Sequence, residues 1–145
     1  MLEFISLLSS IATMIAVILA AYQLRLNGEQ IKLTREQNIT TFEDDLAREY
    51  REIMKEIPID ACLGDELPED KYQQCIDDLY RYFDLSNEQA FLHKKGRVRP
   101  ETWGFWKDGI DSNLKRPAFK RAWDDIIRRS PNDFTELQDA LKTTA

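Results

Sequence analysis

The chain has 145 residues, 32% of them charged, and a formal net charge of -6 at pH 7. This length allows one domain and an anchor, and the mean hydropathy of -0.50 excludes a protein that crosses a membrane several times. The overall acidity also argues against broad nucleic-acid binding, so we expect no nucleic-acid partner.

The apolar residues are concentrated at the N-terminus. No charged side chain lies between Phe4 and Tyr22, and a helix of this length spans about 28 Å, close to the hydrocarbon thickness of a bilayer. We predict a transmembrane anchor over residues 1–25, with the lipid bilayer as its partner. A cleaved signal peptide is one alternative, but Glu3 is the only charged residue before the run, where a signal would carry Lys or Arg. A buried core helix is the other alternative, although a domain this small would cover an apolar segment of this length poorly.

The charges beside the predicted span indicate its orientation. Arg25, Lys32 and Arg35 follow the span and no Lys or Arg precedes it. Positive residues resist translocation, so we predict a single-pass inner-membrane protein with its N-terminus outside and its domain in the cytoplasm. Cys62 and Cys75 agree with this location, because they lack the C-x-x-C spacing of a redox or zinc site.

Small residues recur along the predicted span at intervals of about one helical turn, which lets two helices approach closely. The candidate helix-packing residues are Ser9, Ala12, Thr13, Ala16 and Ala20. We take self-association or pairing with another span as a hypothesis for this face. The alternative is that it reflects only the usual composition of spans.

Residues 26–38 form the predicted juxtamembrane stalk. Asn27-Gly28 is a turn signal that favours a hinge at the membrane surface. Residues 29–37 are mostly good helix formers and favour a continuous helix instead. Both alternatives stay open at this stage.

Residues 39–145 are predicted to be an all-α domain, a compact bundle of about five helices. The first carries an apolar stripe and ends at Pro58. An irregular acidic segment, Asp60 to Asp70, then leads to a second helix that begins at Pro68 and ends at a left-handed Gly96. Pro100, Pro117 and Ser130-Pro131 start the remaining three. No alternating pattern predicts a strand.

One part of this domain resembles a known family. The segments that carry the resemblance are Tyr82-Phe83-Asp84-Leu85-Ser86-Asn87-Glu88-Gln89, Gly96-Arg97-Val98, Thr102-Trp103 and Trp123. Together with the anchor, they resemble uncharacterised bacterial single-pass membrane proteins that have one N-terminal span and a small C-terminal helical domain. That family has no assigned activity, so the resemblance implies an architecture only.

The sequence contains no recognisable catalytic set. Asp77 and Asp78 point about 100° apart on a helix, which is typical of a solvated face. His93, the one histidine, lies near a predicted helix C-terminus, where a cation interacts favourably with the helix dipole. The acidic segment lacks the ligand spacing of a calcium loop. We therefore expect that the protein is not an enzyme and that it binds no metal ion or cofactor.

Basic residues outnumber acidic ones after residue 92, whereas the reverse holds before it. A dense group precedes the helix that begins at Pro100, where free backbone N–H groups favour an anion. The candidate anion-binding residues are His93, Lys94, Lys95, Arg97 and Arg99, extended by Arg116 and Lys120. An anionic small molecule such as a nucleotide, or a lipid headgroup, would suit such a patch. Alternatively, the basic half complements the acidic half within the chain.

Three aromatic residues on one predicted helix cannot all face the same core. Trp103 and Trp106 lie three apart with Phe105 between them, so either Phe105 or one tryptophan is expected at the surface, marking a partner surface. We predict core packing for Trp103, Trp106 and Trp123.

These observations lead to one functional prediction and two alternatives. We predict a membrane-tethered, non-enzymatic interaction module that presents its domain to a cytoplasmic protein partner or forms a homo-oligomer. The first alternative is a sensor that binds an anionic ligand through the basic patch. The second is a small membrane-perturbing toxin or effector.

Overall fold

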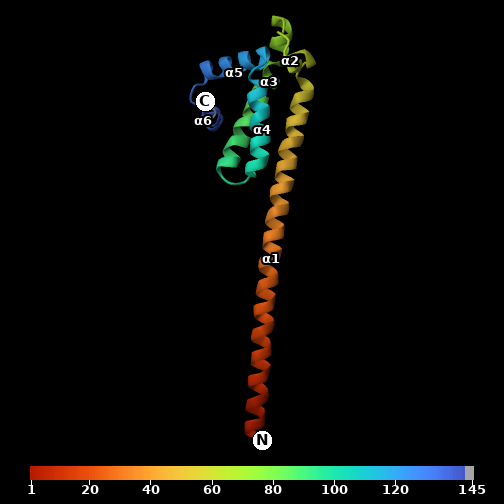
Figure 1. Ribbon diagram of the computed structural model, residues 1–145, viewed down its shortest axis with the longest axis vertical. Helices are drawn as coiled ribbons and strands as arrows, with labels where there is room; N and C mark the ends of the chain where they lie inside the picture. The colour runs from red at the N-terminus through yellow and green to blue at the C-terminus, as the bar shows by residue number, and fades with distance from the viewer. Residues whose placement is uncertain (143–145) are drawn as a thin grey trace. The chain divides into compact units, whose positions relative to one another are not determined.

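The computed structural model describes residues 1–142, apart from the side chains of Leu2 and Ile5, and within them it has six helices and no strand (Figure 1). The helices are α1 (Leu2–Glu56), α2 (Ile59–Leu63), α3 (Glu69–Lys94), α4 (Pro100–Asn113), α5 (Pro117–Arg129) and α6 (Thr135–Lys142). The prediction of an all-α protein is confirmed. The chain divides into two compact units, Met1–Thr40 and Thr41–Ala145.

The first unit is helical over residues 2–40, as part of α1. The helix continues through Asn27 and Gly28, so the structure has the continuous stalk and not the hinge. One glycine costs a helix only about 1 kcal/mol, and good helix formers follow this one. Of the described helices, α1 alone is long and apolar enough to cross a membrane, and no residue of its most apolar window is buried.

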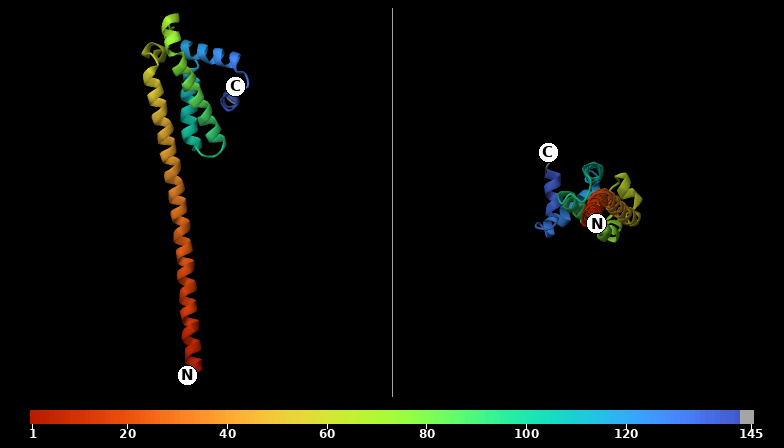
Figure 2. Two further views of the ribbon diagram at one scale, coloured as in Figure 1. Left: turned by 180° about the vertical axis from the view of Figure 1, so that it is seen from behind. Right: turned by 90° about the horizontal axis from the view of Figure 1, so that it is seen from below.

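The second unit is a bundle built around α3. Helices α4, α5 and α6 all pack against α3, and α2 contacts α5. In Figures 1 and 2, α3 and α4 run side by side, and α5 lies across the end at which α3 begins. The last turns of α1 contribute Leu46, Ile53 and Ile57 to the core, as their spacing on one face predicts.

The centre of this core is aromatic. The ring of Tyr82 lies 5.0 Å from that of Phe83 and 5.1 Å from that of Phe119, both edge to face, and Phe83 lies 5.0 Å from Trp123. Such pairs add about 0.5–1.5 kcal/mol each beyond the burial of their area. The buried hydroxyl of Tyr82 accepts a hydrogen bond from Asn113 Nδ2 at 2.8 Å, so the polar atom is satisfied.

The acidic segment contains a short helix that the sequence analysis missed. The prediction of an irregular segment is wrong for residues 60–63, which belong to α2 (Ile59–Leu63), directly after Pro58. Gly64 ends α2 with a left-handed φ of 97°, a conformation that glycine adopts without steric cost. Ala61 is fully buried in the bundle, so packing stabilises a helix too short to persist alone.

The predicted C-terminal end of α3 is confirmed, whereas its start lies one residue after the predicted Pro68. Pro68 precedes its first residue, and Gly96 follows its end with φ 68°. Arg97 N donates to Leu92 O and Gly96 N to His93 O, both at 2.9 Å, which satisfies carbonyls that the helix end leaves free.

The predicted start of the last helix is wrong. The sequence predicts its start at Ser130-Pro131, but α6 begins at Thr135. Phe134 adopts a left-handed φ of 57°, and its buried ring lies 5.5 Å from that of Tyr80 and 6.1 Å from that of Trp123. Burial of this ring therefore offsets the backbone cost and sets the start of α6.

Candidate functional site

A cleft of about 540 Å³ opens between the last turns of α1, α3 and α4. We call it the Phe105 cleft. It is lined by Ala47, Tyr50, Arg51, Tyr82, Gln89, Phe105, Trp106, Asp108, Gly109 and Ile110. All of these residues belong to the second unit, so the cleft is a property of the helical domain.

Phe105 is the exposed aromatic residue of α4. Trp103 and Ile110 are buried and Trp106 packs half-buried against the core, whereas Phe105 is 79% exposed. Positions 103, 106 and 110 share one helical face and position 105 points away from it. The expectation that one of the aromatic residues lies at the surface is confirmed for Phe105, and core packing is confirmed for Trp103, Trp106 and Trp123.

The wall of the cleft is aromatic and its rim is charged. The rings of Tyr50 and Tyr82 lie 6.3 Å apart, and burial raises the pKa of Tyr82 above its ordinary value. Arg51 and Asp108 are exposed, and neither forms an ion pair with any residue that the structure describes. The cleft thus combines an apolar interior with two opposite charges that are available to a partner.

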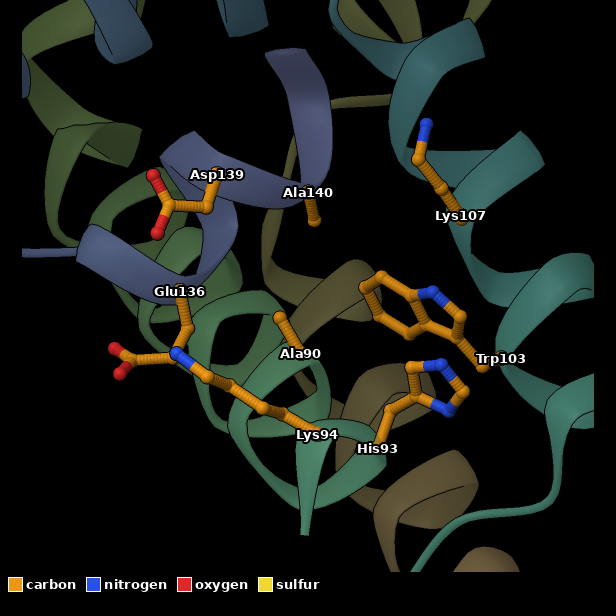
Figure 3. Close-up of a pocket in the computed structure, with 8 residues that line it drawn as sticks. All are labelled: Ala90, His93, Lys94, Trp103, Lys107, Glu136, Asp139 and Ala140. Carbon is orange, nitrogen blue, oxygen red and sulfur yellow. The ribbon is translucent and has the colours of Figure 1, made fainter. Parts of the chain in front are cut away.

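A second hollow, of about 470 Å³, lies between α3, α4 and α6. We call it the His93 pocket, and Figure 3 shows its lining. Its residues are Ala90, His93, Lys94, Trp103, Lys107, Glu136, Asp139 and Ala140. The two acidic residues come from α6, on the side opposite the His93 and Trp103 rings (Figure 3). Because it contains two lysines and two carboxylates, the pocket does not present one sign of charge.

The His93 ring stacks on Trp103, with centroids 5.3 Å apart and planes 13° apart. Its Nδ1 atom is buried and has no hydrogen-bond partner among the described residues. A buried polar atom of this kind is costly unless water or a ligand reaches it. The structure therefore gives His93 an aromatic partner that was not foreseen from its place in the last turn of α3.

The predicted basic patch does not gather on one surface. His93 and Lys94 line the His93 pocket, and Lys95 lies over the Phe91 ring at 5.4 Å. In contrast, Arg97 lies over the ring of Phe42 on α1, with its guanidinium carbon 4.7 Å from the ring centroid. These cations therefore contact different elements of the domain.

The remaining candidates of the patch have partners nearby. The Arg99 guanidinium pairs with Glu43 at 2.7 Å. Arg116 donates a hydrogen bond to Asn113 Oδ1, and Lys120 pairs with Asp124 at 2.6 Å, four residues along α5. Of these three cations, Arg99 and Lys120 have acidic partners and Arg116 has a polar one, but only the Arg99–Glu43 pair joins the basic half to the acidic half, as the intramolecular alternative expects.

Glu43 is a structural residue that the sequence analysis missed. It is 8% exposed, and one carboxylate oxygen accepts a hydrogen bond from the backbone N–H of Arg99 at 2.7 Å while the other pairs with the Arg99 guanidinium. Because Arg99 directly precedes α4, the carboxylate also faces the positive end of that helix. The sequence feature that indicates its burial is its position three residues before Leu46, which places Glu43 on the buried face of α1.

The candidate helix-packing residues of the first unit all have exposed side chains. Thr13 Oγ1 donates to Ser9 O at 2.9 Å, so this hydroxyl is satisfied within its own helix. A polar group on a membrane span needs such a partner, because lipid supplies none. The face formed by Ala12, Ala16 and Ala20 stays a prediction.

The comparisons with known proteins gave no match: no protein-family model matches the chain, and no curated protein or solved structure is significantly similar to it. The resemblance to single-pass membrane proteins therefore has only the residues that carry it as support. Within the described residues, no group of three or more His, Cys, Asp or Glu side chains could hold a metal ion.

Proposed function

We propose that this chain is a single-pass membrane protein whose helical domain binds a protein partner in the cytoplasm through the Phe105 cleft. The observation that carries the proposal is the exposure of Phe105 beside an aromatic cleft. A side chain of this size exposes apolar area to water at a cost that a partner would remove.

The membrane part of the proposal depends on the first half of α1. Its apolar window has a mean hydropathy of 1.9 and buries none of its residues within the chain. A bilayer supplies the apolar surroundings that the chain itself does not. Arg25, Lys32 and Arg35 support a cytoplasmic domain, because they follow the window and none precedes it.

The residue types around the cleft favour a protein partner. Tyr50, Trp106 and Arg51 belong to the three types that contribute most to protein–protein binding energy. The planar rings bury much area and lose little conformational entropy, and Arg51 is exposed at the rim. The cleft is therefore suited to an apolar anchor with a polar surround.

The test is site-specific photocrosslinking in native membranes. A photoreactive phenylalanine analogue at position 105 is expected to form a discrete protein adduct, whereas the same analogue at Ser112, exposed on the same helix but outside the cleft, is expected to form none. Tyr50→Ala, at the opposite wall, is expected to lower the adduct yield several-fold. Equal adducts at both positions, or none at position 105, would contradict the proposal.

A second candidate function, a sensor for an anionic ligand, has the unpartnered Nδ1 atom of His93 in its favour. Lys94 lines the same pocket and forms no ion pair with a described residue. A nucleotide panel added to the full chain in detergent tests it. A rise in melting temperature with one nucleotide, abolished by Lys94→Glu, would support the sensor, and no rise across the panel would exclude those nucleotides as its ligands.

A further inference from the structure

We infer that the partner at the Phe105 cleft is a second copy of this chain, bound about a two-fold axis. The inference builds on the proposed function of the cleft and names its occupant. It follows from the shape and the charge of one surface, taken together.

The shape of the cleft is complementary to itself. A two-fold interface brings the same surface of both copies together, so each feature must find its counterpart on that same surface. The exposed ring of Phe105 and the hollow beside it supply such a pair. In the dimer, Phe105 of each copy enters the cleft of the other, and both rings leave water.

The charges of the rim are also self-complementary. Arg51 on α1 and Asp108 on α4 line the same cleft with opposite charge, and neither has an ion-pair partner among the described residues. Across a two-fold axis, Arg51 of each copy faces Asp108 of the other, which gives two equivalent ion pairs. A partner with a single sign of charge would leave one of the two residues desolvated and unpaired, at a cost.

The proposed membrane anchor favours this occupant over a soluble one. Two copies held in the same bilayer meet at a much higher effective concentration than two free domains do. A modest contact area of one aromatic ring and one ion pair per copy is then sufficient for association. The anchor thus compensates for the small size of the cleft.

The test measures whether two clefts face each other in the full chain. Gly109 lines the cleft, and a side chain added there meets no atom within 4 Å, so Gly109→Cys adds a thiol without steric conflict. In a Cys62→Ser background, which removes the partly exposed native thiol, mild oxidation of membranes is expected to link most chains as disulfide dimers. Ser112→Cys, outside the cleft, is the matched control and is expected to link at least five-fold less.

Charge reversal sharpens the test. Arg51→Asp alone puts two aspartates together at each contact, and Asp108→Arg alone puts two arginines together, so each variant is expected to lose most of its disulfide dimer. Coexpression of the two variants restores an opposite pair at both contacts, so linkage between the two different chains is expected to recover. Phe105→Ala is expected to reduce linkage at least five-fold, whereas Leu63→Ala, equally exposed but on α2, leaves it unchanged.

Three outcomes would overturn the inference: no preference for position 109 over 112, linkage unaffected by Phe105→Ala, or no recovery on coexpression. The melting temperature of each variant is compared with that of the parent, which separates lost contact from lost folding. The outcomes also separate the two proposals. An adduct at position 105 with a different protein, together with no linkage at 109, would leave the proposed function standing and remove the second copy as its partner.

Discussion

The two ends of α1 have the same backbone and opposite surroundings. Around residues 4–22 no side of the helix carries a charge: large apolar side chains such as Leu7, Met14 and Ile18 are exposed on one side, and small residues such as Ala12 and Ala16 on the other. Around residues 39–57, the apolar residues form one stripe, and Ile53 and Ile57 are buried against the other helices of the domain. The comparison shows that the distribution of apolar residues around a helix decides what must cover it. A helix with one apolar stripe packs that face against other helices. A helix that is uncharged around its whole circumference needs an apolar medium on all sides.

Charges in the middle of the first segment should have the largest effect. Each lysine at the centre of a span costs about 2.5–3.5 kcal/mol, so Val17→Lys combined with Ile18→Lys is expected to release the protein from membranes during an alkaline carbonate wash. Asp44→Lys with Glu49→Lys, on the exposed side of the second segment, is the control and should stay in the pellet. Retention of the first variant would show that the segment does not sit in lipid.

A cavity in the aromatic core should have the next largest effect. Phe119 is fully buried against Tyr82, and Phe119→Ala is expected to lower the free energy of unfolding by about 3–5 kcal/mol. Urea unfolding followed by tryptophan fluorescence measures it, because all three tryptophans lie in the domain. Phe105→Ala should change the same quantity by less than about 0.5 kcal/mol, and equal losses would contradict the distinction between core and cleft.

Removal of the Glu43 carboxylate should have an intermediate effect. Glu43→Ala removes the carboxylate that accepts hydrogen bonds from the Arg99 backbone N–H and from its guanidinium, and hydrogen bonds that involve charged groups contribute about 1.5–3 kcal/mol. We therefore expect a loss of about 2 kcal/mol in the same unfolding assay. Glu52→Ala removes an exposed pair with Lys55 at 2.7 Å and should cost much less, because solvent screens such a pair. A similar loss for both would show that Glu43 does not hold α1 to α4.

The last expected effect is confined to alkaline pH and concerns the stability of the folded domain. Burial, and then the neighbouring Asp125 carboxylate, raise the pKa of Tyr72 to about 12. Since the unfolded chain releases this proton near pH 10 and the folded chain keeps it, stability falls as pH rises from 10 to 12. Tyr72→Phe should make that fall shallower by up to about 1.4 kcal/mol per pH unit, measured by urea unfolding at each pH. An unchanged slope would contradict the raised pKa.

Much of the fold could be predicted because local signals marked it. Pro100 and Pro117 begin α4 and α5, and Gly96 follows the end of α3, since the conformational limits of proline and glycine are properties of a single residue. The start of the last helix differs from the prediction because tertiary packing decides it. The ring of Phe134 reaches Tyr80, more than fifty residues earlier, and no local pattern encodes that contact.

The candidate site could be predicted only in part, for the same reason. Helical spacing indicated that Phe105 or a tryptophan would be exposed, and Phe105 is. The arrangement of the cations depends on which helices meet. Arg97 contacts the ring of Phe42 and Arg99 pairs with Glu43, both on α1, so they form no common patch with His93. A run of basic residues in a sequence shows how many cations are present, but not which elements their side chains contact.

The most direct test of a membrane-tethered domain labels both regions of one protein. Single cysteines replace Ser10, in the apolar segment, and Ser112, on α4, in a Cys62→Ser background, and a membrane-impermeant maleimide is applied to intact cells, to permeabilised cells and in detergent. The account predicts that position 112 is labelled once the membrane is permeabilised and position 10 only in detergent. Labelling of position 10 without detergent, or of position 112 in intact cells, would contradict it.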